Sequence, residues 1–191
     1  MSFFFAPDKI VCPTFTLRSY VVGDGALLKE AQNSSYEHLR TFMQWARPEI
    51  RTNEAESSTR KFRARYLLNE DFTIGIFSRD EKKLLGGTGF HHRNRPLTEG
   101  VAEIGMWIRA DCAGQGLGTK VLIEMLKWGF SDWQWVRLFW RCSIKNIASA
   151  HVARKAGMIQ EARLRNDYIS HLDGSRNDTL YFSALKGEWQ V

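Results

Sequence analysis

Gly114, Gly116 and Gly118 alternate with other residues in the segment 112–120. Glycine has no Cβ, so such a turn can aim several backbone N–H groups at one point. A helix that begins directly after the turn adds its unpaired N-terminal amides and the positive end of its dipole. Apolar residues follow at helical spacing, namely Leu117, Val121, Leu122, Met125, Leu126 and Phe130. The segment therefore predicts a cradle for an anion such as a pyrophosphate.

The segment before the cradle has the pattern of a β-strand. Residues 101–108 are rich in β-branched and aromatic side chains, and Gly105 predicts a bulge. A strand, a glycine turn and a helix in this order are typical of phosphate-binding loops. The two standard nucleotide fingerprints are not met, because the turn ends in Gly-Thr-Lys instead of Gly-Lys-Ser/Thr and reads G-x-G-x-G instead of G-x-G-x-x-G.

Glu103 is the first candidate for acid–base chemistry. Alternation along its strand places it on the same face as Gly105 and Trp107, so its carboxylate can point into a cleft beside the cradle and act as a general base. His91 and His92 near the end of another predicted strand are weaker candidates, because neighbouring strand residues face opposite ways and only one of them can enter the cleft.

The remaining periodicities predict one α/β domain over residues 1–191 with a mixed sheet. Strands are expected over 14–20, 72–78, 84–91, 101–108, 136–142, 159–164 and 178–185. Helices are expected over 25–32, 36–46, 54–68 and 147–156, and from about residue 116 onward.

Composition excludes several classes of protein. The net charge of +6 and the pI near 9.4 favour a polyanionic ligand. No recognised nucleic-acid module accompanies this charge, so nucleic acid is disfavoured as a partner. No apolar run of about 18 residues exists and residues 1–6 lack the features of a signal peptide, so we expect no membrane partner and a cytoplasmic location. Cys12, Cys112 and Cys142 form no C-x-x-C pair, and we expect neither disulfides nor a metal site.

The cradle resembles the acetyl-CoA loop of the GCN5-related N-acetyltransferases (GNAT family), which reads Arg/Gln-x-x-Gly-x-Gly/Ala. Ala113 stands at the first position of that pattern, so one side chain is lost but no backbone donor. Two further segments resemble the RimJ/RimL-like subgroup, which acetylates ribosomal-protein N-termini. They are the 146–158 segment, with an N-x-x-S-x-x-V-x-x-K-x-G pattern, and the 37–46 segment, with an L-R-x-x-M-x-W pattern. The resemblance implies a single-domain GNAT fold with a mixed, mostly antiparallel central sheet flanked by helices.

The resemblance also implies a cosubstrate and site residues. It implies acetyl-CoA bound by Met106, Trp107, Ile108, Ala113, Gly114, Gln115, Gly116, Leu117, Gly118, Thr119 and Asn146. It supports Glu103 as the base and implies that Ser149 protonates the CoA sulfur, although a serine in the first turn of a helix also commonly satisfies backbone groups. Asn146 can cap that helix, contact the pantetheine, or do both.

The acceptor is expected to be an amine. An α-amine has a pKa of about 8 and a lysine about 10.4, so near neutral pH the α-amine is richer in its nucleophilic form by roughly two decades. We therefore expect a protein N-terminus, such as that of a ribosomal protein, to be the acceptor, by direct attack in a ternary complex. A small-molecule amine such as a polyamine or an antibiotic is the alternative, and a CoA-binding or nucleic-acid-binding regulator without turnover is a third class.

The acceptor is expected to approach through a positive, aromatic entrance. It would be formed by the 36–46 helix, the basic helix that follows it and the loop at 171–176, with Arg40, Arg47, Arg60 and Arg63 supplying the charge. A homodimer is left open by the sequence.

Overall fold

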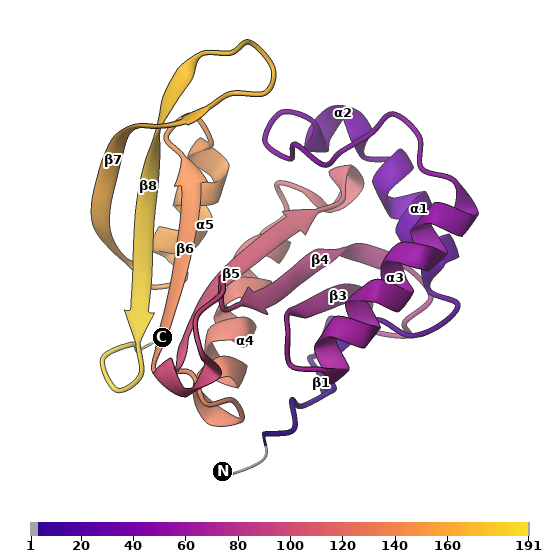
Figure 1. Ribbon diagram of the computed structural model, residues 1–191, viewed down its shortest axis with the longest axis horizontal. Coiled ribbons are helices and arrows are strands. Elements are labelled where there is room, and N and C mark those ends of the chain that lie inside the picture. The colour runs from indigo at the N-terminus through magenta and orange to yellow at the C-terminus, as the bar shows by residue number, and fades with distance from the viewer. Residues whose placement is uncertain (1–3, 191) are drawn as a thin grey trace.

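A computed structural model describes residues 4–190 as one eight-stranded sheet with helices on both faces (Figure 1). Met1, Ser2 and Phe3, which belong to the N-terminal segment considered above, lie outside the described residues, as does Val191. The strands are β1 (Lys9–Val11), β2 (Phe15–Ser19), β3 (Phe72–Ser78), β4 (Leu84–His91), β5 (Val101–Ile108), β6 (Arg137–Ser143), β7 (Ile159–Ile169) and β8 (Arg176–Leu185). The helices are α1 (Gly25–Asn33), α2 (Tyr36–Leu39), α3 (Thr52–Leu67), α4 (Leu117–Ser131) and α5 (Ile147–Lys155).

The sheet is antiparallel at every pairing except one. Its order is β1-β2-β3-β4-β5-β6-β8-β7, and only β5 and β6 run parallel. Their pairing begins at Val101 with Arg137 and ends at Glu103 with Phe139. Beyond that point β5 stays paired with β4 and β6 stays paired with β8, so the two strands diverge. This is the mixed, mostly antiparallel sheet expected from the sequence.

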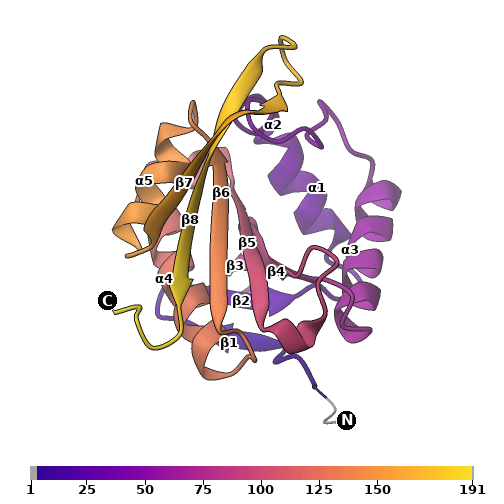
Figure 2. The ribbon, with the colours of Figure 1, turned by 60° about the vertical axis from the view of Figure 1, so that its left-hand side comes forward.

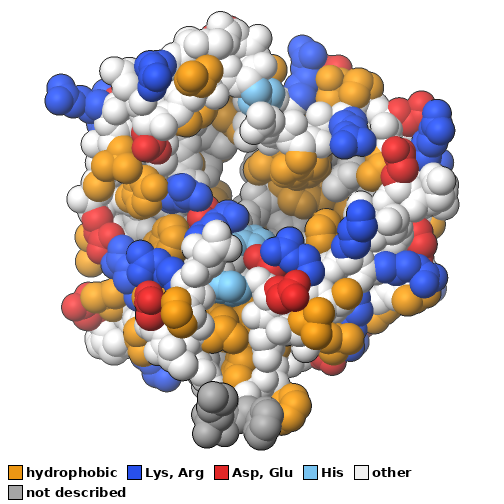
Figure 3. All heavy atoms as spheres, in the orientation of Figure 1, with side chains coloured by type: hydrophobic (Ala, Val, Ile, Leu, Met, Phe, Trp, Pro, Cys, Tyr) orange, Lys and Arg blue, Asp and Glu red, His pale blue; other side chains and the backbone are white. Residues whose placement is uncertain are grey.

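Helices cover both faces of this sheet but leave the gap between the diverging strands β5 and β6 uncovered. Helices α1 and α3 pack together on one face, and α4 and α5 lie on the other (Figure 2). The space-filling view shows the molecule hollowed beside the diverging strands (Figure 3).

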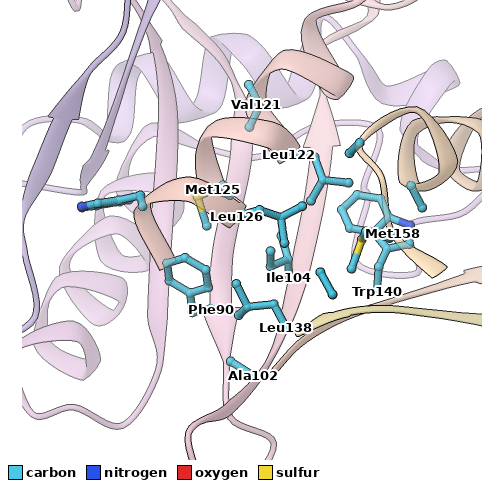
Figure 4. Packing of buried hydrophobic residues seen from close by; sticks show 14 of the residues in the cluster. Phe90, Ala102, Ile104, Val121, Leu122, Met125, Leu126, Leu138, Trp140 and Met158 are labelled. Atoms are coloured by element: carbon cyan, nitrogen blue, oxygen red, sulfur yellow. The ribbon is translucent and has the colours of Figure 1, made fainter. Parts of the chain in front are cut away.

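The apolar face of α4 packs on the sheet. Phe90, Ala102, Ile104 and Leu138, from β4, β5 and β6, meet the apolar face of α4 (Figure 4). That face consists of Val121, Leu122, Met125 and Leu126, each fully or almost fully buried. The apolar positions that the helical spacing predicts are therefore the buried positions of α4. Their packing on the sheet holds the start of α4 beside the end of β5.

The structure differs from expectation in several elements, among them β1, which was not expected from the sequence. The helix expected over 36–46 ends at Leu39 and continues as turns, because Phe42 and Trp45 border a cavity instead of packing into the core. The expected bulge at Gly105 is absent from the continuous β4–β5 register, and a register shift occurs instead at Ile76 and Phe77. The strand expected over 159–164 extends to Ile169 as one arm of a long hairpin.

An aromatic cluster closes the core beneath α4. Trp133 stacks on Trp135 with ring centroids 6.0 Å apart, and it packs edge-on against Phe72. Both indole N–H groups are buried without a hydrogen-bond acceptor within residues 4–190. Their contribution is therefore one of apolar volume and not of hydrogen bonding.

Trp133→Ala is expected to lower the free energy of unfolding by about 3–5 kcal/mol, because it opens a large cavity in this cluster. Trp133→Phe should cost much less, since it keeps an aromatic ring and removes an N–H that has no partner. Denaturant unfolding of both variants checks the difference. An equal loss in the two variants would show that a smaller aromatic ring does not preserve the packing of this cluster.

Candidate active site

The glycine turn forms an open set of amides at the start of α4. Gly114 and Gly116 have φ of +73° and +80°, in the left-handed region that favours glycine, and space is open around both Cα atoms. Gly116 is the N-cap of α4 and offers no side chain to the helix. Within residues 4–190, the amides of positions 114–119 donate to no protein acceptor. This geometry presents several N–H donors and a helix dipole to an anion, as the sequence indicates.

The turn opens into a cavity of about 1630 Å³. Single-ligand sites usually measure roughly 300–1,000 Å³, so this cavity has room for two substrates. One wall is the end of β5 and the other is formed by β6 and α5, on either side of the strand divergence. Predicted site residues that line it are Glu103, Met106, Trp107, Ile108, Ala113, Gly114, Gly116, Gly118, Thr119, Asn146 and Ser149.

Two predicted residues do not line this cavity. The Gln115 side chain turns back and donates to the Asp111 carbonyl at 2.8 Å, and Leu117 packs against the core. Their backbone amides remain part of the turn. Ala113, the departure from the family pattern, borders the cavity, so the turn reaches it without a long polar side chain at that position.

Ser149 is tied into its surroundings by two hydrogen bonds. Its backbone N–H donates to Oδ1 of Asn146 at 3.0 Å, which confirms Asn146 as the N-cap of α5. The indole Nε1 of Trp140 donates to Ser149 Oγ, also at 3.0 Å. Because the hydroxyl oxygen accepts from the indole, its own proton can be donated. The Cys142 thiol is one partner within reach, since a hydrogen bond with Ser149 offsets part of the rise that burial causes in the pKa of Cys142.

Glu103 lies on the cavity wall, but two arginines hold its carboxylate. Oε2 accepts from Nε of Arg93 at 2.7 Å and from Nη2 of Arg141 at 2.8 Å, while the side chain is only 8% exposed. Burial alone would raise the pKa of this carboxyl, but the two guanidinium hydrogen bonds outweigh it and hold the pKa below its usual value. A carboxylate stabilised in this way is a weak proton acceptor. Within residues 4–190, no group donates to its second oxygen, Oε1.

His91, a weaker candidate than Glu103 from sequence, lines the same cavity and is paired with Asp71. His91 Nδ1 lies 2.7 Å from Oδ1 of Asp71, the residue just before β3. His91 is paired across the sheet with Glu103. His91 and Asp71 are 20 positions apart in the sequence, and the antiparallel pairing of β3 with β4 brings them together. His92 instead contacts the Glu70 carbonyl and does not line the cavity.

The outer end of the cavity lies between the α2 region and the β7–β8 hairpin. Phe42 and Trp45 line it from one side, and Trp45 meets Trp107 with ring centroids 5.9 Å apart. From the other side His171 Nε2 lies 2.8 Å from the Arg40 carbonyl, which links the hairpin to the turns after α2. The entrance is aromatic, as expected from the sequence.

The expectation that the entrance is positive is wrong. Arg60 and Arg63 form ion pairs with Glu56 and Asp8 and do not line the cavity. Among residues 4–190, acidic and basic side chains line the cavity in equal number. They are Glu37, Glu54, Glu103, Asp167 and Asp173, and Arg47, Arg93, Arg141, Lys145 and Lys155.

Comparison with known proteins identifies the family. A model of the acetyltransferase (GNAT) domain matches residues 15–159, a span that runs from β2 through the cradle and α5. The chain belongs to the GNAT acetyltransferase family.

Among its relatives, YdaF of Bacillus subtilis (strain 168), provisionally named a ribosomal N-acetyltransferase, is 28% identical over 89 residues. The matched part is 47% of this chain and 48% of YdaF, so the match spans about half the length of that protein. Many solved structures share the fold, and two of them serve as examples. RimL, a ribosomal L7/L12 α-N-protein acetyltransferase in complex with CoA, has a TM-score of 0.80 at 19% identity, over 92% of this chain and 96% of RimL.

The second solved structure is the microcin C7 self-immunity acetyltransferase MccE in complex with acetyl-CoA and AMP. It has a TM-score of 0.81 at 20% identity, over 95% of this chain and 98% of MccE. The same fold therefore occurs in a protein acetyltransferase and in an immunity enzyme.

Within residues 4–190, none of the helices has the length and apolar character needed to cross a bilayer.

Gly116→Val is expected to weaken acetyl-CoA binding more than tenfold, or about 1.4 kcal/mol, because a branched side chain strains the positive φ and obstructs the amides. Gly187→Val is the matched control, since Gly187 also has a positive φ with open space around it but does not line the cavity. Calorimetric titration with acetyl-CoA measures both variants. Unchanged affinity in a folded Gly116→Val variant would contradict the placement of the cosubstrate.

Proposed function

We propose that this protein transfers the acetyl group of acetyl-CoA to the α-amine of a protein N-terminus, such as that of a ribosomal protein. One observation carries the proposal, namely a cavity that has backbone amides without a protein acceptor at one end and an aromatic entrance at the other. The strand divergence lies between these two ends. Two substrates entering from opposite ends would meet there, which suits direct transfer in a ternary complex.

Acetyl-CoA fits the cradle end. Its pyrophosphate would accept hydrogen bonds from the amides of 114–119, and the dipole of α4 would favour its charge. Beyond Glu103, alternate backbone groups of β5 face the gap instead of a neighbouring strand, so Met106, Trp107 and Ile108 can bind the pantetheine amides. Asn146 faces the same channel from the start of α5.

The reaction needs an acid for the departing thiolate and a group that holds the amine. Ser149 is proposed as the acid, because Trp140 donates to its oxygen and its hydroxyl proton can turn from Cys142 toward the cavity that both residues line. Glu103 is proposed to hold the incoming amine through Oε1, directly or through a water, while Arg93 and Arg141 fix Oε2. Its lowered pKa keeps it ionised, so Oε1 can accept a hydrogen bond from the amine N–H.

The α-amine is the preferred acceptor for a physical reason. Within the cavity the charges balance, so nothing selects a strongly cationic polyamine, and an α-amine is deprotonated more readily than a lysine. YdaF and RimL are named as ribosomal-protein acetyltransferases, which supports this choice. MccE is an immunity acetyltransferase with bound AMP, so an acceptor of small-molecule size is the second candidate.

The proposal predicts release of free CoA thiol from acetyl-CoA in the presence of short peptides that begin with Ser or Ala. The peptide should gain one acetyl group at its first residue, as read by mass spectrometry. The same peptides with a blocked N-terminus serve as the control and should give no release. Turnover with spermidine or an aminoacyl nucleotide but with none of the peptides would replace the leading candidate by the second.

Ser149→Ala is expected to lower kcat about tenfold with acetyl-CoA affinity unchanged, which is less than the about 10² to 10⁴ typical of a general base, because a thiolate is a good leaving group. It should also lower the free energy of unfolding by about 1 kcal/mol, since the Trp140 indole loses its acceptor. Ser149→Thr keeps the hydroxyl and is the matched control. Parental kcat in Ser149→Ala would leave Ser149 with the structural role only.

A further inference from the structure

We infer that His91, held in place by Asp71, is the proton acceptor for the attacking amine. The inference deepens the proposed function and rests on it. It assigns the proton to the imidazole and leaves Glu103 as the group that holds the amine. The argument has three parts: the hydrogen bond that fixes the imidazole, the surface on which it lies, and the charges around it.

Asp71 fixes which ring nitrogen of His91 can accept a proton. Asp71 Oδ1 lies 2.7 Å from His91 Nδ1, and Asp71 Oδ2 accepts from the Thr73 hydroxyl at 2.9 Å. Burial alone would raise the pKa of Asp71, but its hydrogen bond with His91 and its other partners hold it below the usual value, so Asp71 is an acceptor. Nδ1 must then carry the proton of the neutral ring. Nε2 is left with its lone pair.

The sheet provides a flat place for the ring. Gly89 on β4 and Gly105 on β5 are direct partners in the register. A Cβ on Gly89 would lie 3.1 Å from His91 Nε2, and a Cβ on Gly105 would lie at the same distance from that atom. The imidazole therefore lies across this glycine pair, and any larger residue at either position would crowd it. His91, Gly105 and Glu103 all line the cavity at the point where β5 and β6 diverge.

The charges around the ring suit a base that becomes cationic. Asp71 supplies a counter-charge for the imidazolium. Glu103 on β5 is the other facing carboxylate, and it is already neutralised by Arg93 after β4 and Arg141 on β6. Arg65 on α3 acts on Asp71 from a longer distance. Together these groups leave Asp71 as the charge that most directly balances a proton gained at Nε2.

The transfer can be written with its atoms in balance. The nitrogen of the neutral amine forms a bond to the thioester carbonyl carbon, and one N–H proton passes to His91 Nε2. As the tetrahedral intermediate collapses, the C–S bond breaks and its electron pair leaves with sulfur. The thiolate takes a proton from the Ser149 hydroxyl or from water. The products are the amide and CoA thiol, and the imidazolium returns its proton to solvent or to the Ser149 oxygen.

The test compares His91→Gln and Asp71→Asn with His92→Gln, a neighbouring histidine outside the cavity. CoA release from acetyl-CoA is measured with a short Ser-initiated peptide between about pH 5.5 and 9. His91→Gln should lower kcat by about 10² to 10⁴ and remove the acid limb of the profile, with acetyl-CoA affinity unchanged. Asp71→Asn should lower kcat and move the acid limb to lower pH, because the imidazolium loses its counter-charge. His92→Gln should keep the parental profile.

Chemical rescue separates catalysis from a structural role. Added imidazole should restore turnover to His91→Ala in proportion to its neutral form, whereas a purely structural histidine would not be replaced in this way. If His91→Gln fails to fold, the acid-limb shift in Asp71→Asn and the rescue decide the question.

The outcomes also separate this inference from the proposed function. A parent enzyme that acetylates no peptide and no small amine overturns both. If the parent enzyme turns over and His91→Gln keeps a kcat close to parental with an intact acid limb, the inference alone is overturned. Glu103, acting through a water, is then again the candidate proton acceptor.

Discussion

The short parallel pairing of β5 with β6 is the constraint on which the rest of the structure depends. It ends at Glu103 and Phe139, yet each strand remains extended because its outer neighbour continues to pair with it. Two rigid walls therefore separate without either one losing its hydrogen-bonded support. Strand β5 then leads into the glycine turn and β6 leads into α5, so both helix N-termini flank the same opening. The proposed substrate binding and chemistry are concentrated where β5 and β6 stop pairing with each other.

Local signals in the sequence were sufficient to predict the glycine turn and the fold class. The positive φ values of Gly114 and Gly116, the apolar period of α4 and the Asn146 cap each depend on a few neighbouring residues. The 36–46 segment shows where local reasoning fails. Its residues are compatible with a helix, but the helix ends at Leu39 and the chain continues in turns. Phe42 and Trp45 line the cavity and do not pack into the core, so tertiary structure decides the conformation of this segment.

The electrostatics of the site depended on contacts that sequence spacing does not reveal. Glu103 was recognisable as a carboxylate on the correct face of its strand, but the arginines that hold it come from a loop and from β6. In the same way, Asp71 and His91 meet only because β3 and β4 pair in one register. The basic character of α3 was visible, yet Arg60 and Arg63 are occupied by Glu56 and Asp8.

The distribution of tryptophans gives the protein a built-in optical reporter. Trp128, Trp133 and Trp135 are enclosed in the core, where no ligand can reach them. Trp45 and Trp107 border the cavity, one at its outer end and the other on β5. Ligand entry changes the polarity around the two cavity tryptophans and leaves the surroundings of the three core tryptophans unchanged. Intrinsic fluorescence can therefore follow occupancy of the cavity without a label, against a constant background from the core.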